Sequence, residues 1–129
     1  DDNAHKGALK ANQRFIIMGD QNASRVEGDA IITKTSQGII ALLNSNKIQD
    51  PLPTSLGGEK HLTDNSHSIN HTAYWGMRAD YVLPSTFGFT IKKSGVFWPQ
   101  QNEETHRLIK NRQASSDHRL VWVDVELTK

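Results

Sequence analysis

The 129-residue sequence contains no cysteine, and this absence excludes two kinds of stabilising site. Without thiols the chain can form neither a disulfide nor a thiolate-based zinc site, and its composition does not indicate a redox compartment. No apolar run approaches the roughly 18 residues that a membrane-spanning helix requires. The polar residues 1–7 do not resemble a signal peptide.

A strong charge of one sign is also missing. The 15 Lys and Arg residues nearly balance the 14 Asp and Glu residues, which leaves a net charge of +1. No overall basic field therefore indicates a surface dedicated to the DNA backbone, which requires several Lys or Arg contacts. Hydrophobic residues make up only 36% of the chain, so we expect a loop-rich fold or a part of a larger one.

What the sequence does contain is a set of short apolar runs separated by polar segments. Runs of this kind predict strands over residues 14–18, 80–84, 87–98 and 120–127. Apolar residues at helical spacing predict a helix over 33–44 and a short one over 103–112. Residues 54–76 show no periodicity and predict a long irregular loop. This order indicates an α+β fold with mostly antiparallel strands and one or two helices.

Three segments share one design, which is an acidic residue at the edge of a predicted buried strand. They are Gly19-Asp20-Gln21-Asn22, Arg78-Ala79-Asp80-Tyr81 and Ser115-Ser116-Asp117-His118. If the three strands are neighbours in one sheet, their ends bring together three carboxylates, an amide and an imidazole. Such carboxylates repel one another unless a cation or a protonated histidine lies among them. Hard cations such as Mg²⁺ prefer oxygen ligands, and this set suits phosphoryl transfer with activated water.

Each segment taken singly has a simpler explanation. Gly-Asp-x-Asn is commonly an ordinary turn, because Asp and Asn bond to their own backbone. Asp80 could form a salt bridge with Arg78, and Ser-Asp-His could be a helix cap or a surface turn. The order and spacing of the three segments together are far more specific than any one of them.

The stretches GDQNA, RADYVLPS and SSDHRLVWVDVEL resemble the C-terminal half of the endonuclease/exonuclease/phosphatase superfamily, the deoxyribonuclease-like metal-dependent phosphoesterases. The resemblance covers about residues 14–127. FIIMGDQNA, DPLPTSLGGE and SGVFWP resemble a bacterial branch that is often exported, which implies an extracellular or periplasmic location. The resemblance also implies a two-sheet α/β sandwich, a divalent cation (Mg²⁺ foremost, or Mn²⁺ or Ca²⁺), and a phosphate-ester substrate, either nucleic acid or a small phosphoester.

The resemblance assigns a role to each motif residue. Asp20 would orient or deprotonate the attacking water, or assist the leaving group, and Asn22 would bond to the scissile phosphate. Asp80 would hold His118 in its tautomer, and His118 would donate to the phosphate. Asp117 would contact or approach the metal. The general base remains open between Asp20 and His118.

The superfamily's first half, which supplies the principal metal-binding glutamate, has no counterpart in this sequence. The four glutamates in question do not stand in the matching context; they are Glu27, Glu59, Glu103 and Glu104. We therefore expect residues 1–129 to form a partial domain that is inactive or nearly so alone and self-associates through an uncovered apolar face. The alternative function is a non-catalytic half-domain, or a degenerate relative, that binds a partner or stabilises an assembly.

Outside the motifs, a few side chains have a chemical as well as a structural interpretation. The spacing His67-x-x-x-His71 would suit zinc on a helix, but the surrounding Gly, Asn and Ser favour a solvated loop. Trp98 and Trp122 are expected in the core, whereas Trp75 is the tryptophan to consider for substrate contact. Arg119, directly after His118, is the best candidate for electrostatic support of a phosphate.

Overall fold

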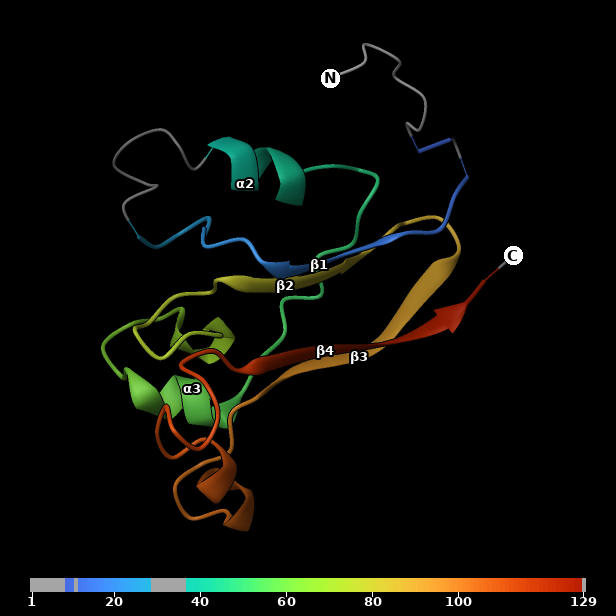
Figure 1. Ribbon diagram of the computed structural model, residues 1–129. Helices are drawn as coiled ribbons and strands as arrows, with labels where there is room; N and C mark the ends of the chain where they lie inside the picture. Colours follow the sequence, from blue (N-terminus) through green and yellow to red (C-terminus); the bar gives the residue numbers. More distant parts are fainter. Residues whose placement is uncertain (1–8, 11, 29–36, 129) are drawn as a thin grey trace.

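The structure is a computed structural model that describes residues 9–10, 12–28 and 37–128 (Figure 1). Four strands pair into two antiparallel two-stranded sheets, β1 with β2 and β3 with β4. This α+β arrangement is consistent with half of an α/β sandwich, as expected. Along the chain the elements are β1 (Ile16–Asp20), α2 (Gln37–Leu43), α3 (Leu56–His61), η1 (Ser68–Asn70), β2 (Asp80–Pro84), β3 (Phe89–Phe97), η2 (Glu104–Leu108) and β4 (Leu120–Leu127).

The β1–β2 pair carries one apolar core on the side covered by α2 (Figure 1). Ile39 of α2 lies in one buried cluster with Tyr81 and Leu83 of β2. Burial raises the pKa of Tyr81 to about 12, and its hydroxyl donates to the carbonyl of Ala23, 2.9 Å away. The predicted strand at 80–84 is confirmed. The predicted helix at 33–44 is observed from 37 to 43, and residues 33–36 lie outside the described part of the chain.

The β3–β4 pair runs in register from Phe89↔Leu127 to Phe97↔Leu120, with a shift between Ile91 and Lys93. A shift of this kind is typical of a β-bulge, and Ser94 and Gly95 beyond it remain paired with Val123 and Trp122. The predicted strand at 120–127 is confirmed. Trp122 was expected in the core, but it is 42% exposed, and its ring packs against Gly95, where a Cβ would meet it at 2.7 Å.

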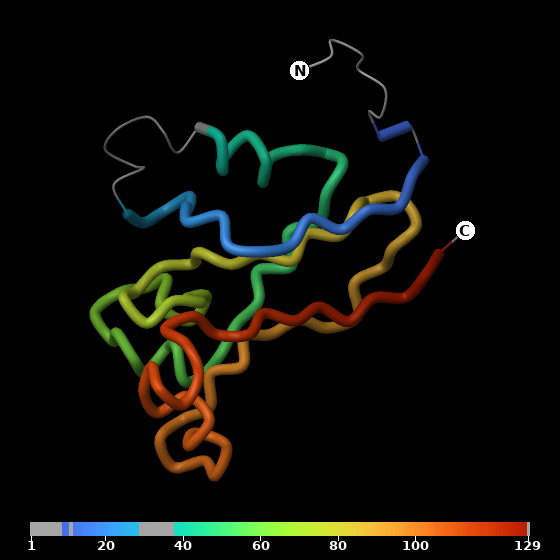
Figure 2. Tube along the Cα trace, in the orientation of Figure 1, coloured from blue at the N-terminus to red at the C-terminus, as the bar shows by residue number. Residues whose placement is uncertain are grey.

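One extended segment ties the two sheets together. Figure 2 shows the tube after α2 passing from the β1–β2 pair to the β3–β4 pair. The amide of Gln49 donates to the carbonyl of Pro84 at 2.8 Å, and the amide of Val96 donates to that of Thr54 at 3.0 Å. The condition considered from the sequence, that the three motif strands are neighbours in one sheet, is not met, because β4 pairs with β3 in a separate sheet.

The prediction of an irregular loop over 54–76 is wrong, because this segment contains α3 and η1. The hydroxyl of Ser55 caps α3 by accepting from the amide of Gly58 at 3.1 Å. Gly57 is required by close packing, since a Cβ there would lie 2.0 Å from the carbonyl oxygen of Trp98. Two glycines in a six-residue helix hide it from pattern analysis, because glycine has poor helix propensity.

The remaining predicted helix, at 103–112, is a short 3₁₀ helix, η2. No helix in the described part of the chain is both long enough and apolar enough to span a membrane.

Candidate active site

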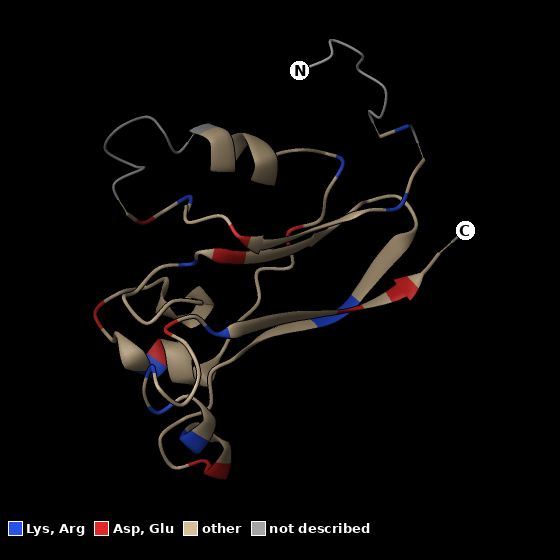
Figure 3. Cartoon of the chain, viewed as in Figure 1, with Lys and Arg blue, Asp and Glu red and all other residues tan. Residues whose placement is uncertain are grey.

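Two carboxylates meet where β1 ends and β2 begins. The antiparallel register places Asp20 directly opposite Asp80. Gly19, with φ of +135°, has a backbone conformation that disfavours other residues, and it sits immediately before Asp20. Figure 3 shows the red, acidic positions of the two strands side by side at this end of the sheet. Like charges this close make the edge a natural place for a cation or an imidazolium.

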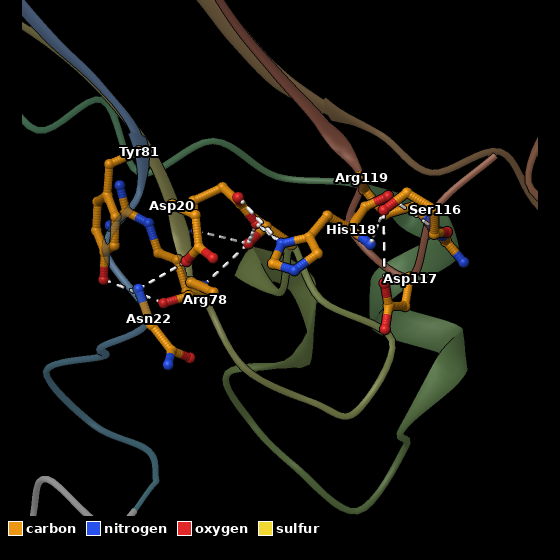
Figure 4. A network of polar contacts seen from close by, with 11 residues as sticks. Asp20, Asn22, Arg78, Tyr81, Ser116, Asp117, His118 and Arg119 are labelled. Atoms are coloured by element: carbon orange, nitrogen blue, oxygen red, sulfur yellow. Dashed lines mark hydrogen bonds and ion pairs between the residues drawn. The ribbon is translucent and has the colours of Figure 1, made fainter. Parts of the chain in front are cut away.

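His118 supplies that imidazole from the segment preceding β4. Its Nδ1 lies 2.9 and 3.1 Å from the two carboxylate oxygens of Asp80 (Figure 4). The hydrogen bond that Nδ1 donates to Asp80 raises the pKa of His118 above 6.5, opposed in part by desolvation and aided by the charges of Asp80, Asp20 and Asp117. Because Asp80 engages Nδ1, the tautomer is fixed and Nε2 is the nitrogen left for a substrate.

Backbone contacts between two segments far apart in sequence bring His118 to the acids. Ala73 forms an isolated antiparallel bridge with His118. On either side of that bridge, the amide of Tyr74 donates to the carbonyl of Asp117 at 2.8 Å, and the amide of Arg119 donates to that of Thr72 at 2.7 Å. The site is thus assembled across both sheets by the 72–74 segment.

Thr72 is a fully buried site residue that the sequence analysis missed. Its hydroxyl donates to Oδ2 of Asp80 at 2.7 Å and accepts from the amides of Ala79 and Asp80 at 3.0 and 2.9 Å. These three bonds use the one proton and both lone pairs of the hydroxyl. Asp80 is therefore held from two sides, by Thr72 and by His118.

Trp75 lies next to the imidazole of His118. Its ring meets that imidazole edge-on with the centroids 5.0 Å apart, and its side chain remains 50% exposed. An exposed indole beside a reacting group can contact a substrate, as considered from the sequence.

The structure places the two remaining motif residues at the margins of this centre. The backbone amide of Asn22 donates to Oδ1 of Asp20 at 2.7 Å. The φ of Asn22 is +44°, a left-handed conformation that asparagine tolerates. Asp117 lies on the other side of His118 from Asp20 in Figure 4, and its carboxylate is 3.5 Å from Arg112.

The donor atoms present fit a hard divalent cation. One ligand atom each from Asp20, Asp80 and His118 lies within 4.8 Å of the others. Asp20 is exposed, whereas both oxygens of Asp80 already accept hydrogen bonds. The carboxylate oxygens suit Mg²⁺ or Mn²⁺, and Asp20 is the most available of them.

A second polar cluster, centred on Glu27, is structural. Glu27 pairs with the buried His71 and accepts from the amide of Arg78 at 3.1 Å. Burial would raise the pKa of Glu27, but the hydrogen bonds from His71, Arg78 and Ser24 hold it below 4.5. The guanidinium of Arg78 contacts Asp50 through both terminal nitrogens, so it does not pair with Asp80.

His67 and His71 do not share a helix. His71 is fully buried beside Glu27, whereas His67 is exposed and precedes the short η1. The expectation of a solvated loop is wrong for His71, because the fold buries it as a partner for Glu27. Hydrophobic periodicity could not reveal the Glu27–His71 pair, since the two residues are 44 positions apart.

Comparison with known proteins places these residues in a family. The model of the Endonuclease/Exonuclease/phosphatase family matches residues 1–118, which include all the proposed site residues. No curated protein and no solved structure matches the chain significantly.

Proposed function

This chain belongs to the endonuclease/exonuclease/phosphatase family, and we propose that it carries half of the catalytic centre of a metal-dependent phosphoesterase. The observation that carries the proposal is the Asp80–His118 pair facing Asp20 across the end of the β1–β2 sheet. A carboxylate that orients an imidazole beside a free carboxylate is suited to proton transfer at a phosphate ester.

We assign the roles of the residues from their contacts. His118, whose pKa Asp80 raises, would donate in its protonated form from Nε2 to a phosphate oxygen and stabilise the negative charge that develops there. Asp20, exposed at the end of β1, orients the attacking water and accepts its proton. Because His118 acts here as the proton donor, we assign the role of general base to Asp20. Asn22 follows on the same turn, and we propose that its side-chain amide donates a hydrogen bond to a phosphate oxygen.

Within the Asp20–Asp80–His118 group, Asp20 is the carboxylate that we propose to hold a divalent cation, most simply Mg²⁺. Asp117, on the other side of His118, lies outside this group, and we propose only that it approaches the cation. When bound, the cation neutralises phosphate charge and lowers the pKa of water. Asp80 is not assigned as a ligand, because Thr72 and His118 occupy its oxygens.

We also propose that residues 1–129 form a partial domain. β4 exposes Leu120 by 67%, Trp122 by 42% and Leu127 by 68%, and β1 exposes Met18 by 64%. Apolar side chains in strands are normally covered by a second layer. The family's first half would supply that layer, together with the glutamate expected to complete the cation site. The same exposed strands support the alternative function of a non-catalytic module that binds a partner.

The test compares this chain with a longer one that adds the family's first half. Both are assayed on a chromogenic phosphodiester and phosphomonoester with Mg²⁺, Mn²⁺ or Ca²⁺, with chelator, and as His118→Ala. We expect cation-dependent hydrolysis by the longer chain, loss of it in His118→Ala, and little or none by residues 1–129 alone. Inactivity of the longer chain on both esters would favour the binding module, and full activity of the short chain would refute the partial domain.

A further inference from the structure

A pocket of about 490 Å³ lies beside the proposed catalytic centre. It is bordered by α3, by the chain after β3 and by the segment around η2. Tyr74 and Arg119 line it, and their sequence neighbours Trp75 and His118 belong to the catalytic centre. The pocket and the catalytic centre are thus formed by consecutive residues of the same two segments.

The lining of this pocket is cationic. Lys60, Lys110 and Arg119 contribute permanent positive charges, and His61 and His106 add two imidazoles. Among the described residues that line it there is no Asp or Glu. A concave surface with charge of one sign concentrates ligands of the opposite sign.

Arg119 gives the pocket an unusual feature, a buried cation without a carboxylate partner in the described part of the chain. It is only 5% exposed, and its terminal nitrogens donate to the carbonyls of Ser116, His118 and Ile109. Its buried Nε has no hydrogen-bond partner among the described residues.

The guanidinium of Arg119 is held between two aromatic walls. Its carbon lies 4.8 Å from the centroid of the Trp98 ring and 5.9 Å from that of Tyr74. Burial of a charge is costly unless an opposite charge compensates it, so an anionic ligand would be favoured here. Lys, Arg and His donors around one space are the groups that recognise phosphate.

We propose that this pocket binds a second phosphate group of the substrate, adjacent to the one that is hydrolysed. The inference rests on the proposed function, and it narrows the substrate to a molecule that carries two phosphates close together. Tyr74 lines the pocket and Trp75 contacts His118, and with 58% and 50% of their side chains exposed they would contact the group that joins the two phosphates.

The binding test titrates the 129-residue chain with inorganic phosphate in the presence of chelator and follows the indole N–H signals by NMR. Trp98 reports on the pocket, and Trp75 reports on the catalytic centre. We expect the Trp98 signal to shift and the Kd to rise about tenfold in Lys60→Gln and in Lys110→Gln, the effect of one charge-assisted hydrogen bond. Lys93→Gln on β3, outside the pocket, is the control and should leave the Kd unchanged.

Two results of the titration would overturn the pocket as a phosphate site. One is a shift of Trp75 alone, which places phosphate only at the catalytic centre. The other is equal affinity in the pocket variants and the Lys93→Gln control. An unchanged spectrum overturns it as well.

The substrate test uses whichever form of the chain hydrolyses phosphodiesters, and it compares a thymidine dinucleotide with and without a 5′-phosphate. We expect a kcat/KM about tenfold higher with the extra phosphate, and we expect Lys110→Gln to remove the difference. Equal kcat/KM values would overturn the substrate role and leave a site for free phosphate. Hydrolysis of neither dinucleotide, by a form that is active on the chromogenic phosphodiester, would overturn this substrate role and leave the proposed function standing, while the titration separately decides whether the pocket binds phosphate.

Discussion

The hydroxyl of Thr72 donates a 2.7 Å hydrogen bond to the carboxylate of Asp80, on the oxygen that also faces His118 at 2.9 Å. The same hydroxyl accepts the backbone amide of Asp80. Thr72 thus fixes both the backbone and the side chain of Asp80. The position of the His118 imidazole depends on this fully buried threonine, which touches no substrate itself.

Replacement of Thr72 tests this positioning role. Thr72→Val keeps the shape but leaves the backbone amides of Ala79 and Asp80 without a partner and removes one hydrogen bond from the Asp80 carboxylate, which we expect to cost about 1–3 kcal/mol of unfolding free energy. Turnover should fall by at least about tenfold, since misplacement of an imidazole affects the transition state. Thr72→Ser keeps the hydroxyl and should restore most activity.

A purely structural role for Thr72 predicts a different pattern. In that case Thr72→Val would lose stability while the pKa of His118, measured by NMR, stayed at its wild-type value. We expect that pKa to move, because the Asp80 carboxylate would no longer be held in place.

The protonation of His118 makes both the stability of the fold and the proposed activity depend on pH. Asp80 raises the pKa of His118 in the folded chain. The His118–Asp80 interaction therefore contributes fully to the free energy of unfolding below the unfolded-state pKa of 6.5, and this contribution is lost as the pH rises through the higher folded-state pKa. Phosphoesterase activity should fall over the same rise, since the imidazolium donates to the phosphate. In Asp80→Asn we expect NMR titration to give a lower pKa and the activity limb to move to lower pH. A His118 pKa at or below 6.5 in the wild type would contradict this account.

The strands and the motif residues were largely predictable from the sequence, because short apolar runs and polar strand ends are local signals. Residues 80–84 and 120–127 form strands as expected. The relation between the strands was not predictable, since β4 pairs with β3 and reaches the site through Ala73. Pairing depends on contacts between distant segments, and periodicity within one segment carries no information about them.

Thr72 and Glu27 escaped prediction for a related reason. Each is a polar residue in a segment without periodicity, and each owes its role to burial against a distant partner. Single polar residues in such segments usually indicate solvated loops. Only the folded arrangement reveals that they satisfy buried groups.

Glu27 provides a test of stability in acid. The pKa of Glu27 in the folded chain is held below 4.5. Its contribution to the free energy of unfolding is therefore present above the unfolded-state pKa of 4.5 and is lost as the pH falls through the lower folded-state pKa. Glu27→Gln should lower the free energy of urea unfolding by about 1–3 kcal/mol at neutral pH, because His71 and the Arg78 amide lose a charged acceptor. The difference between wild type and variant should shrink below pH 4.5. The exposed Glu59→Gln is the control, and an equal loss in both variants would contradict a specific role for Glu27.

Cation binding can be measured without turnover. Mg²⁺ or Mn²⁺ should raise the Tm of the chain, and chelator should reverse the change, because a ligand of the folded state stabilises it by mass action. Asp20→Asn and Asp117→Asn should each weaken that shift, while Asp124→Asn on β4 should not. Persistence of the full shift in both Asp20→Asn and Asp117→Asn would place the cation elsewhere.

The exposed apolar strands make a prediction about association. Leu120 and Leu127 of β4 expose about two thirds of their surface, 67% and 68%, and strand pairs with open edges readily join one another. We expect light scattering at tens of micromolar to show oligomers of the 129-residue chain, and Leu120→Lys to shift them toward monomer. Leu56→Lys is the matched control, since Leu56 is 58% exposed but lies on α3. A monomeric wild type would count against an uncovered sheet, whereas association that only the β4 substitution disrupts would locate the missing layer of the sandwich on β4.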